Sequence, residues 1–224
     1  MRKTVYSEPA WIVGIMLMSL GTALAEKADF GLSMVVAPAY LLHLKVSESL
    51  SLFTFGAAEY MFQATLLMVM ALLLRRFKIS YLFSFAAALL YGVFLDIFIA
   101  VLANVSAHGM VVRAAFFLSS LLITSFSIAM LFNTYLSPEV YELFVKELST
   151  RFGIRLSRFK TVYDCTSLLA AIIMSLAFFG RFRGIGPGTL VCALSTGWLI
   201  GRFSAAIERL CIFSDALPLR KYFE

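Results

Sequence analysis

Six long apolar stretches, separated by short polar and charged segments, dominate the sequence. They cover about residues 10–28, 52–74, 80–104, 112–136, 160–180 and 186–208. Each is close to the roughly 20 apolar residues that an α-helix needs to cross the hydrocarbon core of a bilayer. Because that core holds no water to pair with backbone N–H and C=O groups, we expect each stretch to be a continuous helix. The pattern predicts an all-α, polytopic membrane protein with six transmembrane helices.

Two shorter stretches follow the first and the fourth span, and both are predicted to be short helices. Residues 30–44 are apolar and interrupted by Pro38, which indicates a half-helix or an interfacial helix. Residues 137–150 begin with Ser137 as a helix N-cap and Pro138 at the first helical position. Apolar side chains then gather on one helical face: Val140, Leu143, Phe144 and Leu148. We expect this amphipathic helix to lie flat on the cytoplasmic membrane surface.

The two halves of the chain match at a fixed offset of 105 residues. Glu59 then corresponds to Asp164, residues 76–78 (Arg-Phe-Lys) to residues 181–183 (Arg-Phe-Arg), and Gly92 to Gly197. A unit of three spans that occurs twice in succession must insert its second copy in the opposite orientation. Inverted repeats of this kind build many secondary transporters, with the binding site where the halves meet. We predict two inverted three-helix repeats, over about residues 8–106 and 110–210.

Composition and charge agree with a single membrane domain that spans residues 1–224. The chain is 61% hydrophobic and 14% charged, with a mean hydropathy of +0.91, whereas soluble domains carry about 25% charged residues. The net charge of +6 does not indicate nucleic-acid binding, because the basic residues lie between the apolar spans. With the amino terminus in the cytoplasm, 13 basic residues fall on the cytoplasmic side and five on the other. Both termini, including a tail over residues 211–224, are therefore predicted to be cytoplasmic.

Three segments resemble the bacterial YczE/YyaS/YitT family of integral membrane proteins. Residues 28–33 (Ala-Asp-Phe-Gly-Leu-Ser) are similar to the family's turn after the first span, and residues 90–98 to the Gly-x-x-x-Asp-x-Phe ending of its third span. Residues 184–189 (Gly-Ile-Gly-Pro-Gly-Thr) resemble the start of its last span. Residues 133–138 (Asn-Thr-Tyr-Leu-Ser-Pro) depart from the family's Gly-Pro-Arg-Asp-type turn. The resemblance implies a multi-pass protein of the bacterial plasma membrane with a poorly defined role in transport.

Charged side chains within the spans are the main candidates for a site, because each costs about 2.5–3.5 kcal/mol on insertion scales. Glu59 and Asp96 are expected at similar depth near the extracytoplasmic side. Two carboxylates in close proximity cannot both ionise readily, so the pair would hold a proton or another cation. The alternative is that Glu59 faces the lipid headgroups.

Asp164 and Arg202 are expected near each other on the cytoplasmic side. Their pairing would be a structural ion pair or a gate that opens when the pair breaks. Glu26 and Asp29 either line a cavity where the first span ends or belong to an ordinary hydrated helix end. Three polar side chains on the same spans are further binding candidates: Tyr60, Gln63 and Tyr163.

These observations favour a small secondary transporter of an unidentified solute, coupled to a proton or another cation. Two alternatives stay open: the membrane component of an ATPase-driven uptake system, with a small-residue groove over residues 86–92, and a scaffold or regulator of other membrane proteins. Besides the lipid bilayer and the solute, a second copy of the chain or a partner subunit would be its partner. The sequence contains no paired nucleophile and base, no spacing of metal ligands and no nucleotide motif. We therefore expect no enzymatic activity, metal, cofactor or nucleic acid.

Overall fold

The computed structural model describes residues 3–136 and 139–215, which form eight helices and two short strands. The elements are β1 (Lys3–Tyr6), α1 (Ser7–Ala28), α2 (Ala37–Val46), α3 (Phe55–Leu74), α4 (Ile79–Leu102), α5 (Met110–Phe132), α6 (Val140–Phe152), α7 (Leu156–Phe179), α8 (Pro187–Leu210) and β2 (Cys211–Ser214). Six helices within this part of the chain are long and apolar enough to cross a membrane: α1, α3, α4, α5, α7 and α8. The predicted helical architecture, with six helices that could span a membrane, is thereby confirmed.

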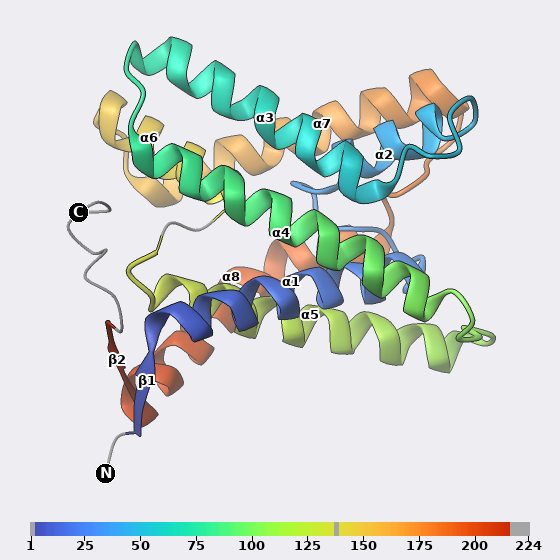
Figure 1. Ribbon diagram of the computed structural model, residues 1–224. Coiled ribbons are helices and arrows are strands. Elements are labelled where there is room, and N and C mark those ends of the chain that lie inside the picture. The colour runs from blue at the N-terminus through green and yellow to red at the C-terminus, as the bar shows by residue number, and fades with distance from the viewer. Residues whose placement is uncertain (1–2, 137–138, 216–224) are drawn as a thin grey trace.

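The six long helices lie roughly along one direction, and α4 lies between two groups of them (Figure 1). On one side of it, α1 packs extensively against α5, and α8 packs against the other side of α5. On the other side, α3 packs against α4. Each of the two short helices, α2 and α6, packs against both α3 and α7. The helix α8 does not pack extensively against α7, although the two are consecutive.

Small residues allow the close approach of α1 and α5. A Cβ atom at Gly21 would overlap the Thr124 side chain, and the Ser127 hydroxyl donates a hydrogen bond of 2.6 Å to the Gly14 carbonyl. Small residues and interhelical hydrogen bonds are typical of helix packing in membranes, where apolar side chains gain little by leaving lipid. The α1–α5 interface is therefore the best-packed part of the molecule.

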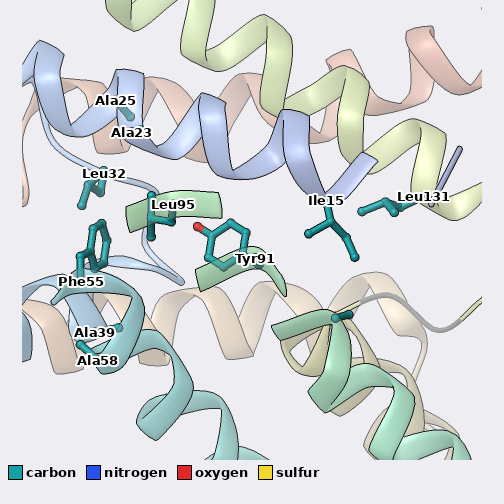
Figure 2. Packing of buried hydrophobic residues seen from close by; sticks show 11 residues of the cluster. Ile15, Ala23, Ala25, Leu32, Ala39, Phe55, Ala58, Tyr91, Leu95 and Leu131 are labelled. Carbon is teal, nitrogen blue, oxygen red and sulfur yellow. The ribbon is translucent and has the colours of Figure 1, made fainter. Parts of the chain in front are cut away.

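The main apolar core lies where α1, α2, α3 and α4 meet. Figure 2 shows Leu95 and Tyr91 of α4 between Phe55 and Ile15, and all four side chains are almost fully buried. The Tyr91 hydroxyl, the polar group of this cluster, donates a 2.9 Å hydrogen bond to Thr22 in α1. This core fixes α4 against both α1 and α3.

The two ends of the chain lie together. Strands β1 and β2 pair in parallel with Lys3 opposite Cys211 and Tyr6 opposite Ser214, so the predicted tail begins with a strand and the fold is not wholly helical. The strands β1 and β2 and the helix α6 lie at one end of the helices, whereas α2 and the α7–α8 connection lie at the other (Figure 1). We call these ends the terminal side and the loop side.

The helix α6 differs from its prediction as a surface helix. It begins at Val140 with Glu139 as its N-cap, and Ser137 and Pro138 lie outside the described residues. Ser149 lies about 180° around the helix from Val140 at 100° per residue, yet both are buried. A helix lying flat on a membrane would leave Ser149 in water. Instead α6 packs among α3, α4 and α7, because both of its faces have a partner helix.

Both short helices begin inside the molecule and run outwards, α6 towards the terminal side and α2 towards the loop side. Ala37, at the start of α2, is fully buried in a cluster with Leu41 and Ala171 of α7. At its other end His43 makes a 2.8 Å hydrogen bond through Nδ1 to the carbonyl oxygen of Phe53, just before α3. The prediction of a short helix after the first span is confirmed.

Candidate functional site

A buried polar cluster lies where the N-terminus of α6 meets the middle of α3. Gln63 is at its centre: its amide Nε2 donates to Glu59 Oε2 at 3.3 Å and to Glu139 Oε2 at 3.4 Å. Its Oε1 accepts a 3.3 Å hydrogen bond from the backbone N–H of Val140. The Tyr141 hydroxyl donates a 2.8 Å hydrogen bond to the same oxygen of Glu59. One amide thus bridges two carboxyl groups, and we call Glu59, Gln63, Glu139 and Tyr141 the carboxyl cluster.

The carboxyl cluster is almost closed to solvent, and its carboxyl groups are only partly satisfied. Glu59 and Gln63 have no exposed surface, and Glu139 is 5% exposed. The second oxygen, Oε1, of each carboxyl group is buried and accepts no hydrogen bond from the described residues. No Lys or Arg within the described part of the chain lies within 4 Å of either group. Two buried acids without a cation are costly when both are ionised.

The Glu139 carboxyl group therefore resists ionisation. Burial raises the pKa of its carboxyl group well above the ordinary value of 4.5, and the neighbouring Glu59 raises it further. The hydrogen bond from Gln63 acts in the opposite direction but does not outweigh them. Such a carboxyl group can bind and release a proton while the same side chains stay around it.

The position of α6 determines the cluster, and Glu147 fixes that position. Glu147 Oε2 accepts hydrogen bonds of 3.0 Å from Arg76 and from the Tyr81 hydroxyl, and its Oε1 accepts one of 3.0 Å from Lys78. Burial opposes ionisation of Glu147, but the hydrogen bonds from Lys78 and Tyr81 and the charge of Lys78 lower its pKa overall. This acid is paired, whereas those of the carboxyl cluster are not. The contrast makes the cluster a candidate functional site.

Asp96 does not pair with Glu59. Its Oδ2 accepts a 2.7 Å hydrogen bond from the Thr54 hydroxyl, and its Oδ1 accepts one of 2.8 Å from the backbone N–H of Gly56. Thr54 is itself the N-cap of α3 and accepts from the Ala57 N–H. Asp96 therefore stabilises the first turn of α3, where the helix dipole favours a negative charge. The predicted pairing of Glu59 with Asp96 is therefore wrong, and Glu59 shares the Gln63 amide with Glu139 instead.

The expected pair of Asp164 and Arg202 is also absent. Asp164 lies 3.7 Å from Lys160 one turn earlier in α7, and Lys160 also contacts Glu142 of α6 at 3.3 Å. The Arg202 guanidinium lies 5.8 Å from the centre of the Trp198 ring in its own helix. Because α8 does not pack extensively against α7, Asp164 and Arg202 do not meet. Each contacts a residue of its own helix instead, Lys160 for Asp164 and Trp198 for Arg202.

Four further candidates have local structural contacts. The Tyr60 ring fills the space above Gly92, and the Tyr163 ring centre is 5.5 Å from that of Phe144. Asp29 is the C-cap of α1 and binds Arg113, whose Nε and Nη2 also donate to the carbonyls of Ala28 and Asp29. Glu26 lines a surface pocket beside this helix end. Of the predicted residues, only Glu59 and Gln63 belong to the carboxyl cluster.

Sequence reasoning missed Glu139 and Tyr141, because residues 137–150 were placed on the membrane surface. The signal that could have found them is the equivalence of the two short helices. If α6 corresponds to the half-helix α2, it begins inside the protein, and an acid at its N-cap is then buried.

Comparison with known families shows where the chain belongs. The model of a family described as of unknown function, DUF6198, matches residues 5–205. The chain belongs to DUF6198. The matched part of this DUF6198 chain contains the whole carboxyl cluster and all but the last turns of α8. No curated protein and no solved structure matches the chain. The match gives no support for the YczE/YyaS/YitT assignment, which rests on the three quoted segments alone.

Proposed function

We propose that this protein is a small secondary transporter in which the carboxyl cluster binds the coupling proton. The observation that supports this most is the pair of buried acids, Glu59 and Glu139, bridged by one amide and without a cation. Ionisable groups within a membrane protein are retained at a cost and are by default functional candidates. A buried group that must alternate between two protonation states needs a partner that tolerates both. The Gln63 amide, which donates to either form, meets this need.

The proton fits the carboxyl cluster better than a larger ion. Glu59 has no exposed surface. A metal cation such as Na⁺ needs several oxygen ligands at once, whereas the described oxygens of the cluster are partly engaged with the Gln63 amide and the Tyr141 hydroxyl. A proton needs neither added space nor a shell of ligands, so a shared proton is the simplest occupant.

The pattern of helix packing supports two inverted repeats. If α1–α4 correspond to α5–α8, the packing of α1 on α4 has its counterpart in that of α5 on α8. In the same way the contact of α2 with α7 has its counterpart in that of α6 with α3. In this proposal α2 and α6 are equivalent half-helices that enter from opposite sides. The carboxyl cluster then lies between the repeats, since Glu59 belongs to the first and Glu139 to the second.

The equivalence fails at two places: α4 packs against both α3 and α6, whereas α8 has no comparable packing against α7 or α2. The first of these differences suggests how the protein moves. Packing of α4 against α3 is extensive, but α8 and α7 lack the corresponding interface. We propose that α8, with α5, moves towards α7 during transport while α4 moves away from α3. The close packing of α3 with α4 would then be lost, and α7 would pack closely with α8 instead. Such an exchange would open the carboxyl cluster first to one side of the membrane and then to the other.

Both alternative functions have less support in the packing. The small-residue groove that an ATPase partner would need is already used inside the molecule, because Ala87 and Ala88 are fully buried and Gly92 packs against Tyr60. A scaffold would need the apolar face of the α6 helix free on the surface, and that face is buried against α3, α4 and α7. We further propose a bacterial plasma membrane location with both termini in the cytoplasm, as the charge bias and the family resemblance indicate.

Proton coupling can be tested in proteoliposomes that contain a pH-sensitive dye. A panel of carboxylates, amino acids, amines and vitamins is added outside, and the internal pH is followed. We expect at least one solute to drive proton movement with the wild-type protein. Glu59→Gln and Glu139→Gln should each abolish this coupled movement, because an amide cannot exchange a proton. The matched control is Glu208→Gln, which removes an exposed acid of α8 and should leave the movement unchanged.

The protonated state of the cluster has its own spectroscopic test. An infrared difference spectrum should contain the carbonyl band of a protonated carboxyl group at neutral pH, and Glu139→Gln should remove it. Coupled proton movement that persists in both glutamine variants would exclude the cluster as the coupling site. Absence of solute-driven proton movement across the whole panel would contradict the proposed function.

A further inference from the structure

A second polar site lies on the loop side, away from the carboxyl cluster. It is a cavity of about 460 Å³ between the segment that follows α1, the helix α2 and the connection between α7 and α8. Its lining includes Tyr40 from the first half of the chain and residues 181–187 from the second. Pockets for small solutes commonly begin at about 300 Å³. The cavity is thus of a size to hold a small solute, and both halves of the chain contribute to it.

Backbone hydrogen bonds hold the two walls of the cavity together. The Leu32 N–H donates to the Gly184 carbonyl at 3.0 Å, and the Gly188 N–H donates to the Phe30 carbonyl at 2.8 Å. At Gly31, where φ is +101°, a Cβ atom would lie 2.5 Å from the backbone nitrogen of Gly186, so the two loops meet only because side chains are absent. The walls are therefore fixed before any ligand binds, which lowers the entropic cost of binding.

The charges in this cavity are unbalanced. Arg181 and Arg183 both line it, and neither lies within 4 Å of a carboxylate among residues 3–136 and 139–215. The acid that shares the lining, Asp29, is already paired with Arg113 at 3.0 Å. Two positive charges therefore face the cavity with one neutralised acid beside them.

The Arg183 guanidinium lies 5.0 Å from the centre of the Phe179 ring, an arrangement that supports its plane and leaves the N–H edge available. The Tyr40 hydroxyl already interacts with the Glu26 carboxylate, and burial, together with that carboxylate, raises the pKa of Tyr40. The two guanidinium groups without a carboxylate partner are therefore the groups that favour an anionic ligand.

We infer that this cavity is the recognition site for a small oxyanion, a carboxylate or a phosphate, and that such an anion is the solute of the proposed transporter. Guanidinium groups bind both kinds of oxyanion through paired N–H···O bonds. This inference rests on the proposed function, because it names the substrate class of the same transporter. A monovalent anion carried together with one proton of the carboxyl cluster would move without net charge.

Binding can be measured without transport. Purified full-length protein in an uncharged maltoside detergent is heated in the presence of increasing succinate, acetate or inorganic phosphate, with sodium chloride at equal ionic strength as the reference. We expect a saturable rise in melting temperature with at least one of these anions. Arg181→Gln/Arg183→Gln should weaken the apparent affinity at least about tenfold, since a lost hydrogen bond to a charged group costs about 1.5–3 kcal/mol.

Two control variants separate this inference from the proposed function. Arg151→Gln/Arg209→Gln removes two exposed arginines elsewhere and should leave anion binding unchanged. Glu139→Gln should keep anion binding while losing coupled proton movement. Equal stabilisation of the wild type and of Arg181→Gln/Arg183→Gln, or no saturable effect of any anion, would overturn the inference. Stabilisation by phosphatidylglycerol in nanodiscs that depends on the two arginines, without any effect of soluble anions, would assign the cavity to lipid and overturn it as well.

Discussion

Individual acids in this protein differ in role because they differ in partner. Asp96 caps a helix, Glu147 binds two cations and a tyrosine, and Glu59 and Glu139 share one amide. Most of these partners come from a distant part of the chain; Gln63 and Glu139, for example, are 76 residues apart. The same residue type thus serves stability in one place and, in the proposed function, proton binding in another, and the local sequence does not distinguish them.

The protonation of Glu139 predicts a pH-dependent stability. Its pKa in the folded protein is raised above the ordinary 4.5, so the folded state binds the proton more tightly than the unfolded state does. Stability from this group is fully present below the ordinary pKa and is lost as the pH rises towards the raised value. We expect the melting temperature of the wild type in detergent to fall over this range, and Glu139→Gln to reduce the fall.

At pH 8 Glu139→Gln should also melt several degrees higher than the wild type, because a gain of about 1 kcal/mol raises the melting temperature by roughly 2–4 °C in a chain of this size. Glu208→Gln, which changes an exposed acid, should follow the wild-type curve. Parallel curves for the wild type and Glu139→Gln would show that Glu139 is not the group that titrates.

Among the helices, the long ones follow from the sequence and the short ones do not. Each long apolar run gives the same helix in any arrangement, because the bilayer leaves the backbone no other option. The periodicity of α6 places Val140, Phe144 and Leu148 on one face, but it cannot show that α3, α4 and α7 surround the helix. Glu59 and Gln63 were recognised from their place in an apolar run. Glu139 was not, because its burial depends on that tertiary packing.

The burial of α6 predicts which of its positions a water-soluble reagent can reach. In a background without Cys165, Cys192 and Cys211, Ser149→Cys should resist a membrane-impermeant maleimide, because Ser149 is only 3% exposed. Lys146→Cys, on the exposed side of the same helix, should react and serves as the control. Rapid labelling of Ser149→Cys would place α6 on the membrane surface.

For the molecule as a whole, the paired strands require that both ends of the chain lie on one side of the membrane. The six candidate spans agree, since an even number of crossings returns the chain to its starting side. Contact between the ends therefore follows from the structure, whereas the cytoplasmic assignment follows from the charge bias.

Reporter fusions test that assignment. Green fluorescent protein should be fluorescent when fused to either terminus, and alkaline phosphatase fused at either terminus should be inactive in bacterial cells. The control is a phosphatase inserted between α4 and α5, in residues 104–108 on the loop side, which should be active. Active phosphatase at both termini would reverse the orientation, and opposite results at the two termini would contradict the six-span topology.

The pairing of β1 with β2 also has a consequence for synthesis. Lys3 and its partner Cys211 are 208 residues apart, which is roughly 10–40 s of translation at about 5–20 residues per second. Throughout that time β1 has no partner strand. The pairing of β1 with β2 is therefore among the last contacts to form, and it joins the first and last elements of the chain. A polypeptide that ends at Leu210 would contain all six candidate spans but would lack β2, so β1 would remain unpaired. Pairing of β1 with β2 would thus distinguish a chain that reaches Ser214 from one that ends at Leu210.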